Sequence, residues 1–136
     1  MSSRIASIRL LVRNRLLVRN RFLARKMTTE IETAELLHSL GYLYAHHGQT
    51  QRGLVLLLIA ARIAPSDVGI LRTLAFALIA DGHGERALAV IDRIASLEPN
   101  FPPTLQLLKS RALWASGDKI EARRCFRSYV EARGQS

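Results

Sequence analysis

The sequence contains little cysteine, few aromatic residues and no long apolar run. Its single cysteine, Cys125, excludes an internal disulfide framework and fits a reducing compartment. Aromatic residues make up 6% of the chain, while Leu and Ala are abundant, which favours packed helices over a β-sandwich. The longest apolar run, residues 54–61, spans eight residues, whereas a membrane-spanning helix needs about 18 or more. We therefore expect no stable membrane insertion.

Acidic residues are missing from the first part of the chain. Residues 1–26 carry seven arginines and one lysine without an acid, whereas residues 27–136 carry 12 basic and 11 acidic residues. Most of the formal charge of +9 therefore belongs to the N-terminal stretch. A nucleic-acid-binding domain would spread basic residues over a folded face. The near-neutral remainder predicts that its partner is not a nucleic acid.

The basic stretch contains a direct repeat, in which the six residues 10–15 recur as residues 16–21. Three interpretations stay open: a wrongly assigned start with Met27 as the true first residue, a basic arm for an anionic surface, or a mitochondrial presequence. The arginines scatter around a helix instead of forming one stripe, which weakens the presequence interpretation. We expect residues 1–29 to be a basic extension without regular structure, and residues 30–136 to be the folded domain.

No catalytic or metal-binding pattern is present. His46 and His47 are adjacent and would point about 100° apart on a helix, so they cannot bind one ion together. Cys125 has arginines beside it but no histidine nearby in sequence to act as a base. The segment Asp81–Gly84 lacks the lysine of a phosphate-binding loop. We expect a protein that is not an enzyme and uses no cofactor.

A period of 34 residues organises the rest of the chain. Pro65 and Pro99 are 34 residues apart, and so are Gly48 and Gly82. This spacing predicts three units, near residues 34–67, 68–101 and 103–136, with one residue inserted around Asn100. We expect six helices near residues 33–47, 50–63, 67–81, 84–97, 103–116 and 119–133.

Small residues and turn residues recur at matching places in these units. Glycines 48, 82 and 117 suit the positive φ that often ends a helix. Gly41 and Ala75 on the first helices, and Gly53 and Ala87 on the second, would allow close approach of the helices. Either Ser66 or Asp67 can cap one following helix, and Asp118 another.

This pattern resembles the tetratricopeptide repeat family. In the first unit, Leu37, Leu40, Gly41 and Tyr44 match the family's first helix, and Pro65 ends the unit. The resemblance implies an all-α fold of three helical hairpins stacked as a short right-handed α-solenoid.

The same resemblance implies a binding groove lined by the first helix of each unit. It assigns a partner-binding groove to the following residues: His38, Tyr42, His46, Arg72, Phe76, Ile79, Leu107, Arg111 and Trp114. Tyr42, Phe76 and Trp114 would then form an aromatic row along the groove. Aromatic residues and arginine carry much of the binding energy at protein interfaces. We therefore expect a polypeptide partner.

The run of residues 54–61 is apolar all around its helix, more than one buried face requires. It either packs between neighbouring helices or lies against a partner subunit. The sequence therefore leaves a homodimer or a heterodimer open.

Residues 34–135 also resemble the small YscY-type assembly chaperones of bacterial type III secretion. The resemblance rests on residues 36–43, on the segment Gly84–Ala87, and on residues 108–112 leading to Gly117 and Ala122. It implies a cytoplasmic chaperone that stabilises a small secreted component and delivers it to the export-gate protein at the inner membrane. The alternative is a generic tetratricopeptide scaffold or assembly adaptor.

Overall fold

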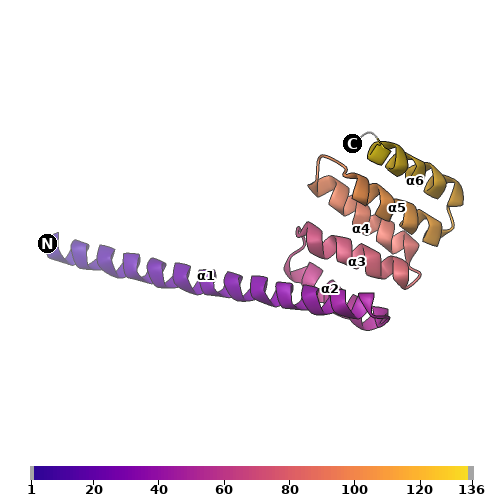
Figure 1. Cartoon of the computed structure of the whole chain (residues 1–136). Coiled ribbons are helices and arrows are strands. Elements are labelled where there is room, and N and C mark those ends of the chain that lie inside the picture. Colours follow the sequence, from indigo (N-terminus) through magenta and orange to yellow (C-terminus); the bar gives the residue numbers. More distant parts are fainter. Residues whose placement is uncertain (1, 135–136) are drawn as a thin grey trace. The chain divides into compact units, whose positions relative to one another are not determined.

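The structure is a computed structural model of the chain, and it describes the backbone of residues 2–134 and the side chains of residues 3–134. Within that range the regular elements are all α-helices (Figure 1). They are α1 (Ser2–His46), α2 (Thr50–Ile63), α3 (Val68–Ala80), α4 (Gly84–Leu97), α5 (Pro103–Ser116) and α6 (Lys119–Gly134). The predicted all-α class is confirmed. The chain divides into two compact units, Met1–Thr33 and Ala34–Ser136.

Helix α1 corrects the expected N-terminal boundary. The prediction placed the first helix near residue 33 after an irregular extension, but α1 is helical from Ser2 onward. Residues 2–40 contain neither glycine nor proline, and arginine, leucine and alanine are good helix formers. The sequence interpretation relied on an apolar stripe, which this segment lacks, whereas its helical turns follow from intrinsic propensity.

The first unit consists of helical turns whose side chains are exposed throughout residues 3–33. Its exposed apolar residues include Leu11 at 62% and Phe22 at 67%. Hydroxyl groups donate to the carbonyl four residues earlier, as from Thr33 to Thr29 at 2.8 Å. The scattered basic and apolar residues leave this segment without a single apolar face.

In the second unit each helix packs on the next along the chain, from α2 with α3 through to α5 with α6. Helix α3 also contacts α5 directly. The end of α1 reaches α3 through a hydrogen bond between His38 and Thr73. Among residues 34–134, the backbones of α2 and α4 do not approach within 8 Å between Cα atoms, nor do those of α4 and α6. The odd-numbered helices therefore form the more closely packed layer.

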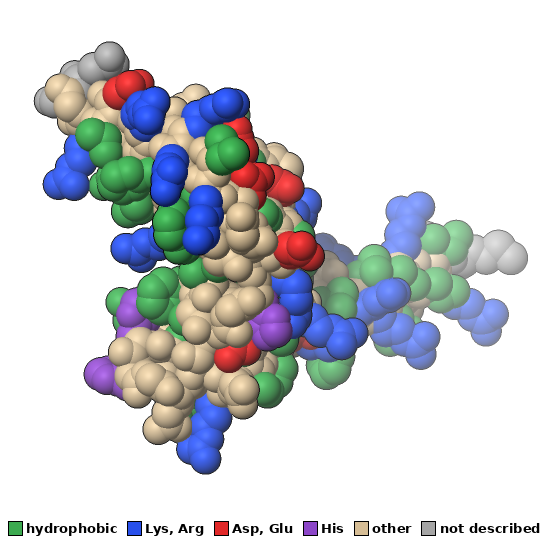
Figure 2. Space-filling view, turned by 90° about the vertical axis from the view of Figure 1, so that its right-hand side faces the viewer, with side chains coloured by type: hydrophobic (Ala, Val, Ile, Leu, Met, Phe, Trp, Pro, Cys, Tyr) green, Lys and Arg blue, Asp and Glu red, His purple; other side chains and the backbone are tan. Residues whose placement is uncertain are grey.

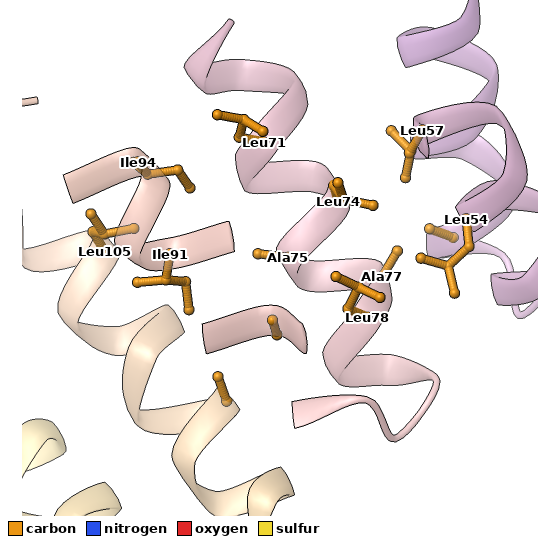
Figure 3. Close-up of a cluster of buried hydrophobic side chains, with 13 residues drawn as sticks. Leu54, Leu57, Leu71, Leu74, Ala75, Ala77, Leu78, Ile91, Ile94 and Leu105 are labelled. Atoms are coloured by element: carbon orange, nitrogen blue, oxygen red, sulfur yellow. The ribbon is translucent and has the colours of Figure 1, made fainter. Parts of the chain in front are cut away.

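The core lies between these helices (Figure 3). Leu54 and Leu57 of α2 face Leu74, Ala77 and Leu78 of α3. Further along the stack, a second contact joins α4 and α5 through the side chains Ile91, Ile94 and Leu105. Most of these residues are fully buried, and each buried aliphatic side chain stabilises the fold by about 1.5–3 kcal/mol. The buried apolar side chains of α2, α3, α4 and α5 thus form the contacts between neighbouring helices.

Three glycine turns set the spacing of the hairpins. Gly48, Gly82 and Gly117 have φ values of 79°, 79° and 96°, a region that side-chain-bearing residues rarely adopt. They are 34 and 35 residues apart, so the extra residue lies between α4 and α5, as predicted. The Asp67 side chain caps α3 by accepting from the Ile70 N–H at 3.1 Å, and Asp118 accepts from the Glu121 N–H at 3.2 Å.

No helix within residues 2–134 combines the length and the hydropathy that crossing a lipid bilayer requires.

Candidate protein-binding surface

Three of the predicted groove residues form a continuous aromatic stack on α1 and α3. The rings of Tyr42 and His46 lie 4.1 Å apart between centroids and are tilted by 40°. The His46 ring then stacks on Phe76 with 4.3 Å between centroids and 11° between planes. Tyr42 keeps 48% of its surface exposed and Phe76 is half-buried. The stack therefore combines rigid packing with an accessible aromatic edge.

His38 holds the same two helices together one turn earlier. Its Nε2 lies 2.8 Å from the Thr73 hydroxyl oxygen, and that hydroxyl donates to the Gly69 carbonyl at 3.1 Å. A hydroxyl has one proton, so a Thr73 hydroxyl that donates to Gly69 accepts from His38 in the tautomer protonated on Nε2. His38 therefore fixes the α1–α3 spacing that the neighbouring aromatic stack needs.

Arg72 and Ile79 lie on α3, on either side of Phe76 in sequence. The Arg72 guanidinium pairs with the Glu98 carboxylate at 3.1 Å, and both side chains are partly exposed. Such an exposed pair contributes little stability and leaves Arg72 available for exchange with a partner carboxylate. Ile79 is half-buried and packs against the main core.

The last three predicted residues line a separate pocket of about 310 Å³ between α5 and α6. Leu107, Arg111 and Trp114 come from α5, and Phe126 of α6 lies opposite them. Trp114 is 51% exposed, and the Lys119 ammonium lies 5.1 Å from its ring centroid. Within the described residues no ring contact joins Trp114 to Phe76. Tyr42 and Phe76 thus belong to the stack, whereas Trp114 lines the pocket.

His46 was expected in the groove, but its role as the residue that bridges Tyr42 and Phe76 was not predicted. The signal was present, because Tyr42 and His46 are four residues apart and so share one helix face. The contact of His46 with Phe76 depends on how α1 packs on α3, which the sequence pattern does not give.

The first hairpin leaves an apolar face exposed. Leu36, Leu40 and Leu43 of α1 are 61%, 38% and 51% exposed. One period later their equivalents Ile70, Leu74 and Ala77 are buried, because α3 packs on a preceding hairpin. On α2, the predicted run 54–61 divides: Leu54, Leu57 and Ala60 are buried, while Val55, Leu58 and Ile59 are exposed. The run is thus partly core and partly open surface.

Cys125, the remaining candidate for a reactive side chain, forms a contact between two helices. Its thiol donates to the backbone carbonyl of Gln106 at 3.3 Å and so joins α6 to α5. Burial raises the pKa of this thiol, against a smaller lowering effect of Lys109. A raised pKa makes the thiol less nucleophilic at neutral pH.

The surface of the second unit mixes hydrophobic and basic side chains, most densely toward the top of the view in Figure 2. Within the described residues no group of three or more His, Cys, Asp or Glu side chains is arranged to hold a metal ion. The chain matches no protein-family model and no curated protein sequence. The accessible aromatic, aliphatic and arginine side chains are suited to holding a polypeptide.

Proposed function

We propose that this chain is a non-catalytic polypeptide-binding protein, with residues 34–134 acting as three tetratricopeptide-type hairpins in a short right-handed α-solenoid. Support comes from the recurrence of one hairpin: glycine turns of positive φ at periods of 34 and 35 residues. The small residues Gly41, Ala75 and Ser110 also recur with those periods, and all three are buried. One supersecondary unit repeated in this way suits a stacked array.

The Tyr42–His46–Phe76 stack is the observation that carries the binding proposal. It lies on α1 and α3, in the more closely packed layer, which in a curved stack is the concave side. Aromatic side chains held in place by their neighbours lose little conformational entropy on binding. Beside them, Arg72 offers a partly exposed guanidinium. An extended or helical segment with apolar anchors fits this surface best.

The more specific proposal is a chaperone of bacterial type III secretion, which binds a small secreted component in the cytoplasm and brings it to the export-gate protein. Its support is the resemblance of residues 36–43, 84–87 and 108–112 to YscY-type chaperones, together with the open apolar surface. A chaperone that keeps an aggregation-prone partner soluble needs such a surface, because the partner's own apolar residues must be covered.

The test is an affinity pull-down with the tagged full-length chain and a Tyr42→Ala/Phe76→Ala double variant. An Ile120→Ala/Val130→Ala double variant is the matched control, since both residues are exposed and apolar but lie outside the stack and the pocket lining. We expect one polypeptide to be recovered with the wild type and the control and lost with the stack variant. Co-expression should keep that polypeptide soluble.

Equal recovery with all three proteins would contradict the assignment of the stack as the binding site. Recovery of a large assembly, without any small polypeptide that needs the chain for solubility, would favour an assembly adaptor over a secretion chaperone.

A further inference from the structure

The first two hairpins are each covered by the helix that follows them, whereas the third is not. Helix α3 packs on the surface made by α1 and α2, and helix α5 packs on the equivalent surface made by α3 and α4. On α5 and α6 no further helix of residues 34–134 covers the same surface. The pocket of about 310 Å³ lies at this place. The pocket therefore lies at the position where each of the two earlier hairpins receives the following helix.

The apolar residues of this end surface confirm the equivalence. Phe126 corresponds to Leu57 and Ile91, which are both 0% exposed under the next helix, yet Phe126 is 49% exposed. Trp114 corresponds to Ala45, which is 6% exposed, and to Ile79, which is half-buried, and itself keeps 51%. Both large aromatic side chains are thus more accessible than their equivalents in the earlier hairpins.

The charges of this end surface differ from those of the earlier ones. Arg123 stands at the position of Leu54 and Leu88, and Arg111 stands at the position of Tyr42 and Phe76. Both arginines line the pocket, and neither makes an ion pair among the described residues. The Lys119 ammonium adds a third cation beside Trp114. A covering helix must therefore offer carboxylates as well as apolar side chains.

The whole α5–α6 hairpin is positively charged. Residues 103–134 contain seven basic and three acidic residues, a net +4, whereas residues 34–102 contain five basic and six acidic residues, a net −1. The positive charge of the second unit is therefore concentrated on the hairpin that lacks a covering helix. Opposite charge on a partner would increase the rate of association and fix its orientation.

We propose that the α5–α6 end surface binds an acidic amphipathic helix of a partner protein, which packs there as α3 and α5 pack on the earlier hairpins. The inference rests on the proposed function and names a second contact for the same partner class. A second copy of this chain fits less well. The exposed α1 residues Leu36, Leu40 and Leu43 of a second copy could supply the apolar contact. However, residues 34–46 contain one acidic residue, Glu35, whereas the α5–α6 end surface carries three cations.

Trp114 makes the test direct, because it is the only tryptophan of the chain and lines the pocket. The probes are two synthetic 16-residue helical peptides with the same Leu and Ala face, flanked by four Glu in one and four Gln in the other. Titrated into the full-length chain, the Glu peptide should shift Trp114 emission to shorter wavelength. It should bind about tenfold more tightly than the Gln peptide at low salt.

Charge-reversed variants locate the contact. Arg123→Glu should abolish the preference for the Glu peptide, whereas Arg62→Glu, on the exposed surface of α2, changes the net charge equally and should preserve it. Phe126→Ala should weaken both peptides, while Tyr42→Ala/Phe76→Ala should leave them unchanged. That last result separates this inference from the proposed function, whose own test depends on the stack.

Several results would overturn the proposal. Equal affinity for the two peptides, or equal loss with Arg123→Glu and Arg62→Glu, would remove the charge argument. A Trp114 emission shift that depends on protein concentration alone, with doubling of the molar mass, would assign the surface to a second copy.

Discussion

The imidazole of His46 lies nearly parallel to the phenyl ring of Phe76, with 4.3 Å between ring centroids and 11° between planes. This contact joins the last turn of α1 to the middle of α3. The same His46 ring also contacts the Tyr42 ring, with 4.1 Å between centroids. One contact therefore connects the packing of two hairpins with the accessible surface that we propose for binding.

The stack should show a measurable coupling energy. In a double-mutant cycle of His46→Ala and Phe76→Ala, we expect a coupling of about 0.5–1.5 kcal/mol in the free energy of unfolding, measured with urea. The pair His46→Ala and Phe126→Ala is the control, since no ring contact joins these two residues among the described residues. A coupling in the control as large as that in the test pair would refute the stack as a distinct interaction.

Gly53 should not tolerate a side chain. A Cβ atom at this position would lie 2.8 Å from the Gly41 carbonyl oxygen and 2.9 Å from the Ala45 backbone nitrogen, and backbone atoms cannot move aside cheaply. We expect Gly53→Ala to destabilise the fold by about 1–3 kcal/mol, despite the better helix propensity of alanine. Gly134→Ala, with nothing within 4 Å of its added Cβ, should change thermal stability little. A neutral Gly53→Ala would mean that α1 and α2 pack less closely than described.

Gln106 should be replaceable by leucine with a gain in stability. Its side-chain Oε1 is buried without a hydrogen-bond partner, and such an atom costs about 1–3 kcal/mol. The equivalent positions in the first two hairpins hold Leu37 and Leu71. We expect Gln106→Leu to raise the free energy of unfolding by about 1 kcal/mol or more. Gln106→Glu, which would bury a charge, should have the opposite effect, and a loss with both would contradict the argument.

Cys125 should react slowly with alkylating reagents. Burial raises its pKa above the ordinary value of 9.0, Lys109 lowers it to a smaller extent, and Glu121 raises it further. The rate of reaction with iodoacetamide should therefore reach its midpoint above pH 9.0 in the folded chain and near that value in urea. Because the unfolded chain ionises first, stability should decrease as the pH rises through this range.

Two neighbouring variants should move that midpoint in opposite directions. Lys109→Met removes a cation and should raise the pKa of Cys125, whereas Glu121→Gln removes an anion and should lower it. Shifts of the same sign in both variants would show that the electrostatic explanation is wrong.

The sequence was sufficient to place five of the six helices within one residue at each end. Glycines at 48, 82 and 117 and prolines at 65 and 103 mark those ends, and the constraints that they impose on φ are local. The predicted start of the first helix, near residue 33, was wrong. Helix propensity is continuous through residues 2–32, so no local signal marks where the helix begins.

The candidate binding surface could not be predicted from local sequence features alone. The sequence by itself determined which residue types stand at the recurring positions, and therefore the all-α class and the turns. Only the tertiary structure decided that His46 contacts Phe76, that Trp114 lines a pocket with Phe126, and that Phe126 stays exposed where Leu57 and Ile91 are buried. The physical reason is that burial depends on which helix packs on each face, and the last hairpin has no following helix among the described residues.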